Sequence, residues 1–329
     1  MNRLECSYAG LKLKSPLTAA SSPLTADIAH LKALEEAGIG AVVLKSVFEE
    51  QIESESKAAL DGLSGGGFAD SSVYFENFIK NTAVDASLEL LEEAKKTLSI
   101  PVFVSLNCVR DGSWYEYAKR AENVGADALE LNLFILPSDV KDSSVDLERR
   151  YLQILKKTVQ SVSIPVCVKL GTYFTGMTHF LKEVSDCGVK GIVLFNRYYN
   201  IDFDIEAEKV VPAAPFSSPD EYLTTLRWIA LSAAELPVDF AAATGIHSAE
   251  TVFKMIAAGA KTVQLCSVLM KDGIKAAEQM RSDLLTLMDR KGCTSISDFC
   301  GKMAQERSSD PSVYERVQYI QFLSGSSRQ

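Results

Sequence analysis

The sequence of 329 residues has few of the features that mark metal proteins or disulfide-bonded proteins. It contains only three histidines, and they lie far apart along the chain. Its seven cysteines are dispersed, without the paired spacing of a metal site, at positions 6, 108, 167, 187, 266, 293 and 300. We therefore expect reduced thiols and no bound metal.

The sequence also lacks an excess of positive charge and a long apolar run. Its formal net charge is −9, which argues against nucleic acid or an anionic membrane as a partner. No segment approaches the ~18 consecutive apolar residues that cross a membrane. The opening segment MNRLECSYAG has no apolar leader region, so the expected location is the cytoplasm.

What the sequence does contain is a regular alternation of two kinds of strand opening. Proline at the first residue of a strand costs no ladder hydrogen bond, and glycine after a helix accepts the left-handed conformation. The prolines are 85, 64 and 72 residues apart and the glycines 87, 63 and 71, which predicts four β-α-β-α units. The openings lie at Pro16, Pro101, Pro165 and Pro237, and at Gly38, Gly125, Gly188 and Gly259.

Segments with helical spacing lie between these openings, at 27–38, 113–125, 176–188 and 248–260. Eight apolar strands that alternate with helices predict an α/β fold, the (β/α)8 TIM barrel. A doubly wound open sheet is the alternative, and it is less favoured because no G-x-G-x-x-G follows the first strand. We expect residues 1–290 to form the barrel and residues 291–329 to form a helical C-terminal tail packed on it.

Two segments are longer than a plain barrel requires. Residues 47–83 lie between the second and third strands, and residues 198–220 follow the sixth. Loops of this length are typical of lids or of segments that cover a substrate. A disordered surface insertion is the alternative for residues 53–72.

The active site of such a barrel lies at the carboxyl ends of its strands. Lysine is rarely buried without a partner, so we expect Lys169 in a site, with an ion pair to Glu130 as the alternative. Lys45 is the other central cation, unless it is a plain surface residue. The predicted strand ends carry Ala20, Ser21, Ser22, Lys45, Ser46, Ser105, Asn107, Cys108, Glu130, Asn132, Lys169, Asn196, Arg197, Thr244, Gly245, Cys266 and Ser267.

The loops after the seventh and eighth strands contain small residues at Thr244–Gly245 and Cys266–Ser267. Small residues let the backbone approach a phosphate, although tight helix packing also explains Gly245. A phosphate there, with lysines and amides nearby, suits a phosphorylated aromatic cofactor, and flavin mononucleotide (FMN) fits well. Lys169 would then stabilise the negative charge of the reduced flavin.

At this point the sequence resembles the dihydroorotate dehydrogenases, FMN-dependent barrel enzymes of pyrimidine synthesis, and within them the soluble class and the dihydroorotate dehydrogenase-like proteins. The resemblance covers residues 5–300. It rests on the segments SPLTAASS, VVLKS, ELNL, IPVCVKL, VLFN, ATGI and VQLCS, in that order.

The resemblance implies a role for each predicted site residue. Ala20 and Ser21 would lie under the flavin, and Lys45 and Ser46 would contact flavin and substrate. Lys169 would lie at the O2 edge of the flavin. The same resemblance implies a homodimer. Asn132 and Asn196 would hold the substrate, and the phosphate would lie against Thr244, Gly245, Cys266 and Ser267.

The sequence departs from the family where the reaction needs a base. In the family, the fourth-strand asparagine is followed by Leu-Ser-Cys-Pro-Asn, and the cysteine (serine in membrane-bound relatives) removes the substrate's C5 proton. The corresponding residue is Ile135, which cannot accept a proton. The glycine- and asparagine-bearing motif expected after the second strand is also absent from residues 47–83.

Three hypotheses follow from this departure. A relocated base, Cys108 or Tyr173, would give a true dihydroorotate dehydrogenase. A different C–C or C=C bond is the second possibility, with Arg197 as the ligand of a substrate carboxylate. A flavin module for binding or electron storage is the third. We favour an FMN oxidoreductase that acts on a CH–CH bond of a small carboxylated substrate. In it the catalytic residues are Lys45, Asn132, Asn196 and Cys108, and the substrate-binding residues are Asn107 and Arg197.

An alternative of another class is a flavin-free aldolase that forms a Schiff base on Lys169, which a yellow purified protein would eliminate. The electron acceptor stays open between fumarate, a nicotinamide nucleotide and another carrier. No cysteine run for an iron–sulfur cluster is present, so such a relay would need a second subunit. His247 is expected only to cap the helix that follows it.

Overall fold

The structure is a computed structural model, and it describes residues 2–50, 71–107, 114–197 and 200–315, together with residues 320 and 323. For residues 71–83 only the backbone is described. Eight parallel strands form a closed ring, because β4 pairs both with β3 and with β6. The predicted TIM barrel is thereby confirmed. Its strands are β3 (Leu17–Ala19), β4 (Ala41–Val43), β6 (Val102–Asn107), β7 (Ala128–Leu133), β8 (Val166–Leu170), β9 (Gly191–Leu194), β12 (Asp239–Ala243) and β13 (Thr262–Leu265).

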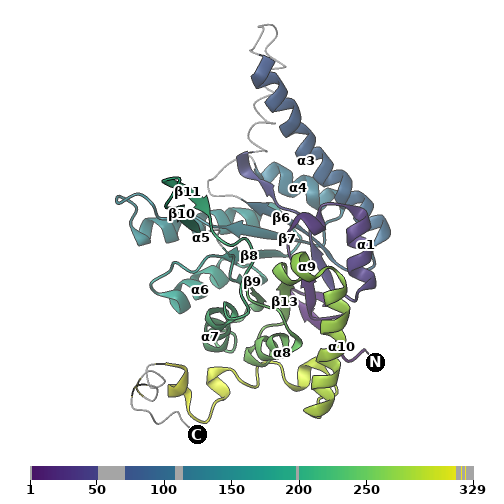
Figure 1. The fold of residues 1–329 in the computed structure, drawn as a ribbon, viewed down its shortest axis with the longest axis vertical. Coiled ribbons are helices and arrows are strands. Elements are labelled where there is room, and N and C mark those ends of the chain that lie inside the picture. The colour runs from purple at the N-terminus through teal and green to yellow at the C-terminus, as the bar shows by residue number, and fades with distance from the viewer. Residues whose placement is uncertain are drawn as a thin grey trace.

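Helices cover the outside of this ring (Figure 1). Side-chain oxygens at Asp27, Ser143 and Ser248 cap the first turns of α1, α5 and α8, which satisfies backbone N–H groups that the helices leave open. The helices are α1 (Ile28–Glu36), α3 (Ser71–Thr97), α4 (Trp114–Val124), α5 (Ser144–Ser161), α6 (Met177–Asp186), α7 (Tyr222–Ser232), α8 (Ala249–Ala258), α9 (Ser267–Asp272) and α10 (Lys275–Arg290).

The glycines that were expected to end helices do so. Gly38, Gly125, Gly188 and Gly259 all have positive φ, between 88° and 127°. Residues other than glycine rarely adopt this conformation, so these four positions stop α1, α4, α6 and α8 and turn the chain into the next strand.

The core has two parts. The larger lies between the strands and the surrounding helices, and the smaller fills the inside of the ring with alanines and a few large side chains. Inside the ring, Tyr8 stacks on Phe103 with ring centroids 6.1 Å apart. Tyr8 ends β1 (Cys6–Tyr8), which pairs with β2 (Leu11–Leu13) in an antiparallel hairpin that the sequence did not predict.

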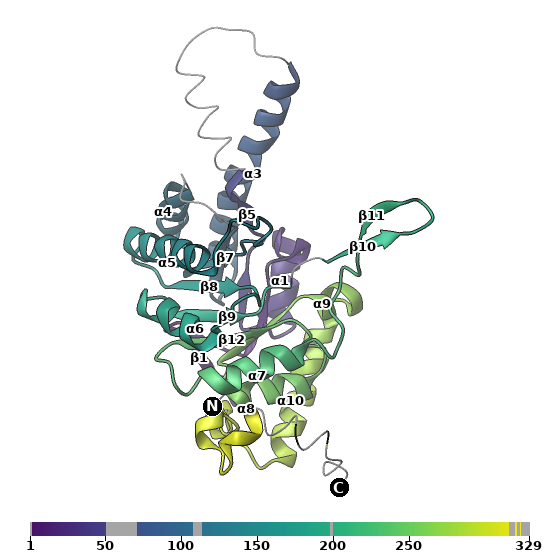
Figure 2. The same ribbon diagram turned by 90° about the vertical axis from the view of Figure 1, so that its left-hand side faces the viewer.

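The first long segment differs from the loop that was expected. Val47–Phe48 forms β5, which pairs with β6, and residues 71–83 belong to helix α3, so the prediction of a loop up to residue 83 is wrong there. Helix α3 extends beyond the body of the barrel (Figures 1 and 2). Residues 51–70 lie outside the described residues, and with them most of the predicted lid.

The second long segment contains a hairpin of β10 (Ile201–Asp204) and β11 (Lys209–Pro212). Figure 2 shows that this hairpin stands clear of the barrel. The chain then returns to the carboxyl ends of the strands, where Pro215 and Ser217 line the pocket described below. In the described part of this segment, Pro215 and Ser217 thus line the pocket, and a role in covering a substrate stays a prediction.

The described part of the C-terminal tail packs on the barrel through short 3₁₀ helices at Ile296–Asp298, Gln305–Arg307 and Pro311–Tyr314. Phe299 stacks on Phe253 of α8 with ring centroids 4.1 Å apart, and the Gly301 N–H donates to the Ile256 carbonyl. The boundary at residue 290 stays a prediction. Among the helices described, none is long and apolar enough to span a bilayer.

Candidate active site

The carboxyl ends of the barrel strands surround a cavity of about 520 Å³, which we call the central pocket. Cavities of this size hold small molecules and cofactors. Every site residue predicted from the sequence lines it, with two exceptions: Cys108 lies outside the described residues, and the candidate base Tyr173 lines a neighbouring cavity. The predicted residues that it brings together are Ala20, Ser21, Lys45, Ser46, Asn107, Asn132, Lys169, Asn196, Arg197, Thr244, Gly245, Cys266 and Ser267.

Strand β7 and the residues after it place alternate side chains in the central pocket. Glu130, Asn132 and Phe134 all line it, as expected for side chains two residues apart on an extended chain. Ile135 instead packs against the core between barrel and helices, and its backbone N–H donates to the Tyr151 hydroxyl over 2.7 Å. The residue at the expected position of the base therefore lines a neighbouring cavity and not the central pocket.

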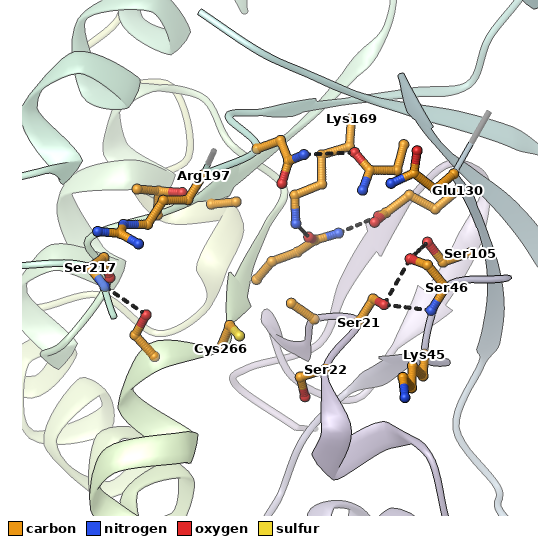
Figure 3. Close-up of a pocket in the computed structure, with 18 of the residues that line it drawn as sticks. Ser21, Ser22, Lys45, Ser46, Ser105, Glu130, Lys169, Arg197, Ser217 and Cys266 are labelled. Atoms are coloured by element: carbon orange, nitrogen blue, oxygen red, sulfur yellow. Dashed lines mark hydrogen bonds between the residues drawn. The ribbon is translucent and has the colours of Figure 1, made fainter. Parts of the chain in front are cut away.

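A chain of three polar side chains crosses the floor of the pocket. The Lys169 ammonium donates to Gln264 Oε1 over 2.8 Å, and Gln264 Nε2 donates to Glu130 Oε2. Figure 3 shows Lys169 and Glu130 reaching toward the middle of the pocket from neighbouring strands. The ion pair of Lys169 with Glu130, which was the alternative reading of the sequence, is not formed directly, because the Gln264 amide lies between the two charged groups.

Glu130 is the buried charge of the site. It is only 1% exposed, and its Oε1 atom has no hydrogen-bond partner among the residues that the structure describes. Burial raises the pKa of the Glu130 carboxyl, while the nearby Lys169 charge and the hydrogen bond from Gln264 act in the opposite direction. Removing the Lys169 charge or the Gln264 hydrogen bond should therefore raise the pKa of this carboxyl further.

Two amide side chains line the wall above this floor. Asn196 Nδ2 donates to Asn132 Oδ1 over 2.9 Å. This contact fixes which way each amide is turned, because it uses one donor and one acceptor of the pair. The Nδ2 group of Asn132 and the Oδ1 atom of Asn196 then remain to bind a ligand, as the predicted role of these residues requires.

Three serine hydroxyls join the ends of strands β3, β4 and β6. Ser46 Oγ lies 3.0 Å from Ser21 Oγ and 2.7 Å from Ser105 Oγ. The Ser46 backbone N–H also donates to Ser21 Oγ over 2.9 Å. These contacts hold the pocket wall beside Lys45, whose ammonium has no ion-pair partner among the described residues and lies at the rim (Figure 3).

The loop after β12 has a constrained backbone. Thr244 has a φ of 73°, unusual for a β-branched residue, and its hydroxyl donates to the Phe195 carbonyl over 3.0 Å. Gly245 also has positive φ, and a Cβ atom there would lie 2.2 Å from the Tyr222 nitrogen at the start of α7. Close helix packing is therefore sufficient to explain Gly245, alongside its place in the pocket lining.

Residues 214–217 fold over this side of the pocket. The Ser217 N–H donates to Ser267 Oγ, and the Ser217 hydroxyl lies 3.0 Å from His247 Nε2. The expectation that His247 caps its helix is wrong, because Ser248 caps α8. Burial and the Lys271 charge lower the pKa of His247, so the neutral imidazole is favoured. Its Nε2 atom shares a hydrogen bond with the Ser217 hydroxyl.

Arg197 has partners within the protein. Its Nε donates to Glu221 Oε2 over 3.0 Å, and its two terminal nitrogens donate to the carbonyls of Pro215 and Ala214. Its charge is matched by Glu221, which weakens the hypothesis that it binds a substrate carboxylate. Lys45 is the cation of the pocket rim that lacks such a partner in the described part of the chain.

The structure also places the candidates for a relocated base. Tyr173 lines a separate cavity of about 230 Å³ beside Ile135, and its ring lies edge-on to Phe134 at 6.1 Å. Cys266 does line the central pocket, but burial raises the pKa of its thiol, so it holds its proton at neutral pH. Cys108 cannot be placed, because it lies outside the described residues.

The donor set of the central pocket fits FMN. Lys169 provides a positive charge for the ring, and Asn132 and Asn196 provide amide groups for its edge and for a substrate. The backbone N–H groups of Gly245 and Ile246 are buried and donate to no acceptor among the described residues. Such groups suit a phosphate, which accepts several hydrogen bonds at once.

Several pocket residues were missed in the sequence, among them Gln264, Phe134 and Ser217. Gln264 interrupts the apolar run TVQL in the eighth strand, and this is the same signal that identified Glu130 and Asn132. Phe134 is an apolar side chain whose direction depends on how the chain leaves β7. Ser217 had no sequence signal, because it comes from a long segment without periodicity. No cluster of three or more histidine, cysteine or acidic side chains that could hold a metal occurs among the residues described.

Comparisons with known proteins agree with this geometry. A family model described as dihydroorotate dehydrogenase matches residues 3–288. The chain is 24% identical over 306 residues to the dihydroorotate dehydrogenase A (fumarate) of Limosilactobacillus reuteri, covering 90% of this chain and 96% of the relative. It is 23% identical over 303 residues to the dihydroorotate dehydrogenase B (NAD(+)) catalytic subunit of Methanocaldococcus jannaschii, with 88% and 95% covered.

A relative with a different named activity matches at a similar level. The chloroplastic dihydropyrimidine dehydrogenase (NADP(+)) of Arabidopsis thaliana is 23% identical over 322 residues, covering 90% of this chain and 76% of the relative. The names of these relatives differ in substrate and in electron acceptor. The match of the family model establishes the family, and similarity at the level of these relatives leaves the substrate to be argued from the pocket.

Proposed function

The chain belongs to the dihydroorotate dehydrogenase family, and on that premise we propose that it oxidises or reduces a CH–CH bond of a small carboxylated substrate other than dihydroorotate. It is an FMN-dependent oxidoreductase, as the members of the family are. The substrate and the absence of the usual base are the parts of the proposal that go beyond family membership.

One observation carries the proposal. The family's base would stand at Ile135, and this side chain is apolar and packs away from the central pocket. Phe134 occupies the pocket wall in its neighbourhood, and an aromatic ring cannot accept a proton either. A Cβ atom at Gly171 would lie 2.6 Å from the Phe134 ring, so the glycine leaves room for this ring.

The remaining pocket residues have roles that suit a carboxylated substrate. FMN, when bound, supplies the acceptor or donor of a hydride. Lys169 holds a positive charge where the reduced flavin is negative, and Asn132 and Asn196 orient the substrate through their free amide atoms. Lys45 at the rim is placed to pair with a carboxylate, the role that Arg197 was first expected to fill.

The alternatives are less well supported. A true dihydroorotate dehydrogenase needs a base within reach, and Tyr173 lines the neighbouring cavity rather than the central pocket. The other candidate base, Cys108, lies outside the described residues, so its distance from the pocket is not given by the structure. The flavin-free aldolase is set aside because the family is FMN-dependent.

The same reasoning extends to the setting of the enzyme. We propose a cytoplasmic homodimer, the assembly that the family resemblance implies. Sedimentation of the purified protein should give a mass of twice the 35.9 kDa chain. A species of one chain mass at micromolar concentration would refute the dimer and leave the flavin chemistry untouched.

Anaerobic titration of the bound flavin with dihydroorotate tests the proposed substrate. General-base catalysis contributes about 10²–10⁴-fold, so without it dihydroorotate should bleach the flavin far more slowly than steady turnover requires. Reoxidation of the reduced flavin by small α,β-unsaturated carboxylates is the positive arm of the same experiment. Rapid bleaching by dihydroorotate would refute the altered substrate.

A further inference from the structure

The polar chain on the pocket floor joins opposite sides of the barrel. Glu130 and Lys169 lie on the adjacent strands β7 and β8, whereas Gln264 lies on β13, four strands away from β7 around the ring. The amide of Gln264 meets both charged groups in the middle, with its oxygen toward the ammonium and its nitrogen toward the carboxylate. Neither charged partner would accept the reverse orientation, because Lys169 only donates and the Glu130 carboxylate only accepts.

Among the described residues, Gln264 is the hydrogen-bond donor that the Glu130 carboxyl has. Gln264 is 3% exposed and Glu130 is 1% exposed, so water does not screen the contact between them. Within the same described part of the chain, Glu130 Oε1 accepts no hydrogen bond. A buried carboxylate in this position depends on one amide, and hydrogen bonds in such a chain polarise one another.

We propose that Gln264 is a positioning residue that couples the charge of Glu130 to Lys169, and so sets how strongly the pocket favours reduced over oxidised FMN. The inference rests on the proposed placement of FMN with its ring beside Lys169. The reduced flavin is anionic, so a bare positive charge at Lys169 favours it, and a negative charge behind that lysine opposes the preference.

The coupling has a defined sign. Glu130→Gln removes the negative charge and keeps the shape, so the Lys169 charge acts unopposed and reduced FMN binds more tightly relative to oxidised FMN. Gln264→Leu removes the amide and isolates Glu130, and a buried carboxyl without a partner takes up a proton. In the Gln264→Leu background Glu130 is then already neutral, so Glu130→Gln should change the preference for reduced FMN only slightly.

A double-mutant cycle tests the coupling directly. The measured quantity is the reduction potential of bound FMN against a reference dye, which gives the ratio of the dissociation constants of oxidised and reduced FMN. We expect Glu130→Gln to raise this ratio about tenfold in the wild-type background, equivalent to about 30 mV for a two-electron couple. In the Gln264→Leu background the same change should raise it less than about twofold.

The controls separate coupling from damage to the barrel. Thr262→Val is a matched polar-to-apolar change on the same strand, with a side chain 1% exposed, and should leave the effect of Glu130→Gln intact. Equal effects of Glu130→Gln with and without Gln264 would overturn the coupling. Gln264→Asn, whose shorter side chain cannot reach both partners, replaces Gln264→Leu if that variant does not fold.

The same measurements distinguish this inference from the proposed function. If wild-type protein binds FMN but the cycle is additive, the coupling fails and the proposed reaction stands. If the cycle shows coupling but dihydroorotate rapidly bleaches the flavin, the substrate proposal fails alone. If the wild-type protein binds no FMN, both fail.

Discussion

Single residues decide which half of the reaction site this chain has kept. Lys169, Asn132 and Asn196 lie in the central pocket with the contacts that a flavin site needs. Ile135 lies outside it, with its backbone bonded to Tyr151. The residues proposed for the cofactor therefore lie together in the central pocket, while the residue at the expected position of the base does not line it.

A cysteine at position 135 should not restore the family's usual reaction. In Ile135→Cys the thiol would still face the packed layer beside Tyr151, so we expect no more than a twofold gain in the rate of flavin reduction by dihydroorotate. Stopped-flow absorbance under anaerobic conditions measures this rate. Phe134→Cys is the matched comparison, because its side chain lines the pocket, and a tenfold gain from position 135 would contradict the placement of Ile135.

Glu130 should make stability depend on pH. Burial raises the pKa of its carboxyl in the folded protein above the ordinary value of 4.5, so the folded state binds the proton more tightly than the unfolded state does. The contribution of Glu130 is then most favourable below pH 4.5 and is lost as the pH rises through the folded value.

The measurement that checks this is the free energy of unfolding of wild type and Glu130→Gln across pH. The advantage of the variant should grow from pH 4.5 upward, to on the order of 1–3 kcal/mol at neutral pH, the usual cost of a buried polar group with an unmet hydrogen bond. Glu250→Gln, an exposed change on α8, serves as the control. A constant difference between Glu130→Gln and wild type would show that Glu130 titrates normally.

The sequence predicted pocket residues well where a strand end specifies their direction. Asn132 and Lys169 lie opposite one another in the register of β7 and β8. Correct prediction of the two strand ends therefore places both side chains in the same pocket. The sequence did not predict contacts that depend on distant segments. The Arg197 ion pair with Glu221 and the Gln264 bridge are of this kind, because each joins residues whose approach is decided by the closed ring.

Among the elements, the turn between β12 and α8 is tightly constrained. Gly245→Ala would force a side chain into a left-handed backbone and within 2.2 Å of the Tyr222 nitrogen. We expect a loss of about 3 kcal/mol or more in the free energy of unfolding. Gly273→Ala is the matched control, with a φ of 80° and open space around it, and should cost about 1 kcal/mol. Denaturant unfolding of both variants measures the difference, and equal losses would refute the close approach.

Regular elements were predictable because proline and glycine mark their ends. The four helix-ending glycines and the capping residues Asp27 and Ser248 are local signals, and the helices form where these signals place them. The hairpin of β1 and β2, and the helix over residues 71–83, were missed because none of these elements opens at one of the prolines or glycines of this series.

For the whole molecule, the repeat of strand openings was sufficient to predict the barrel, because eight buried parallel strands have few other ways to cover both faces. The pairing of β4 with β6 closes the ring, so the carboxyl ends of all eight strands surround the same end of the barrel. The position of the central pocket follows from closure alone, whereas its substrate depends on side chains that the fold does not specify.

FMN should stabilise the whole barrel, because its binding joins several strand ends at once. At a free concentration 100 times the dissociation constant, the expected gain is about 2.7 kcal/mol, seen as a higher midpoint of thermal unfolding. Riboflavin, which lacks the phosphate, should give a smaller gain if the loops after β12 and β13 bind that group. Equal stabilisation by FMN and riboflavin would place the phosphate elsewhere.

The hairpin of β10 and β11 is a sheet of two strands, so both of its outer edges offer unpaired backbone groups to solvent. Its side chains Ile201 and Phe203 are each 65% exposed, a combination that invites other chains to add a strand. Asp202, Asp204 and Lys209 place charges along these edges. Charged side chains along this ribbon are thus a safeguard against fibril growth, and neutralising its aspartates would turn the projecting hairpin into a template for aggregation.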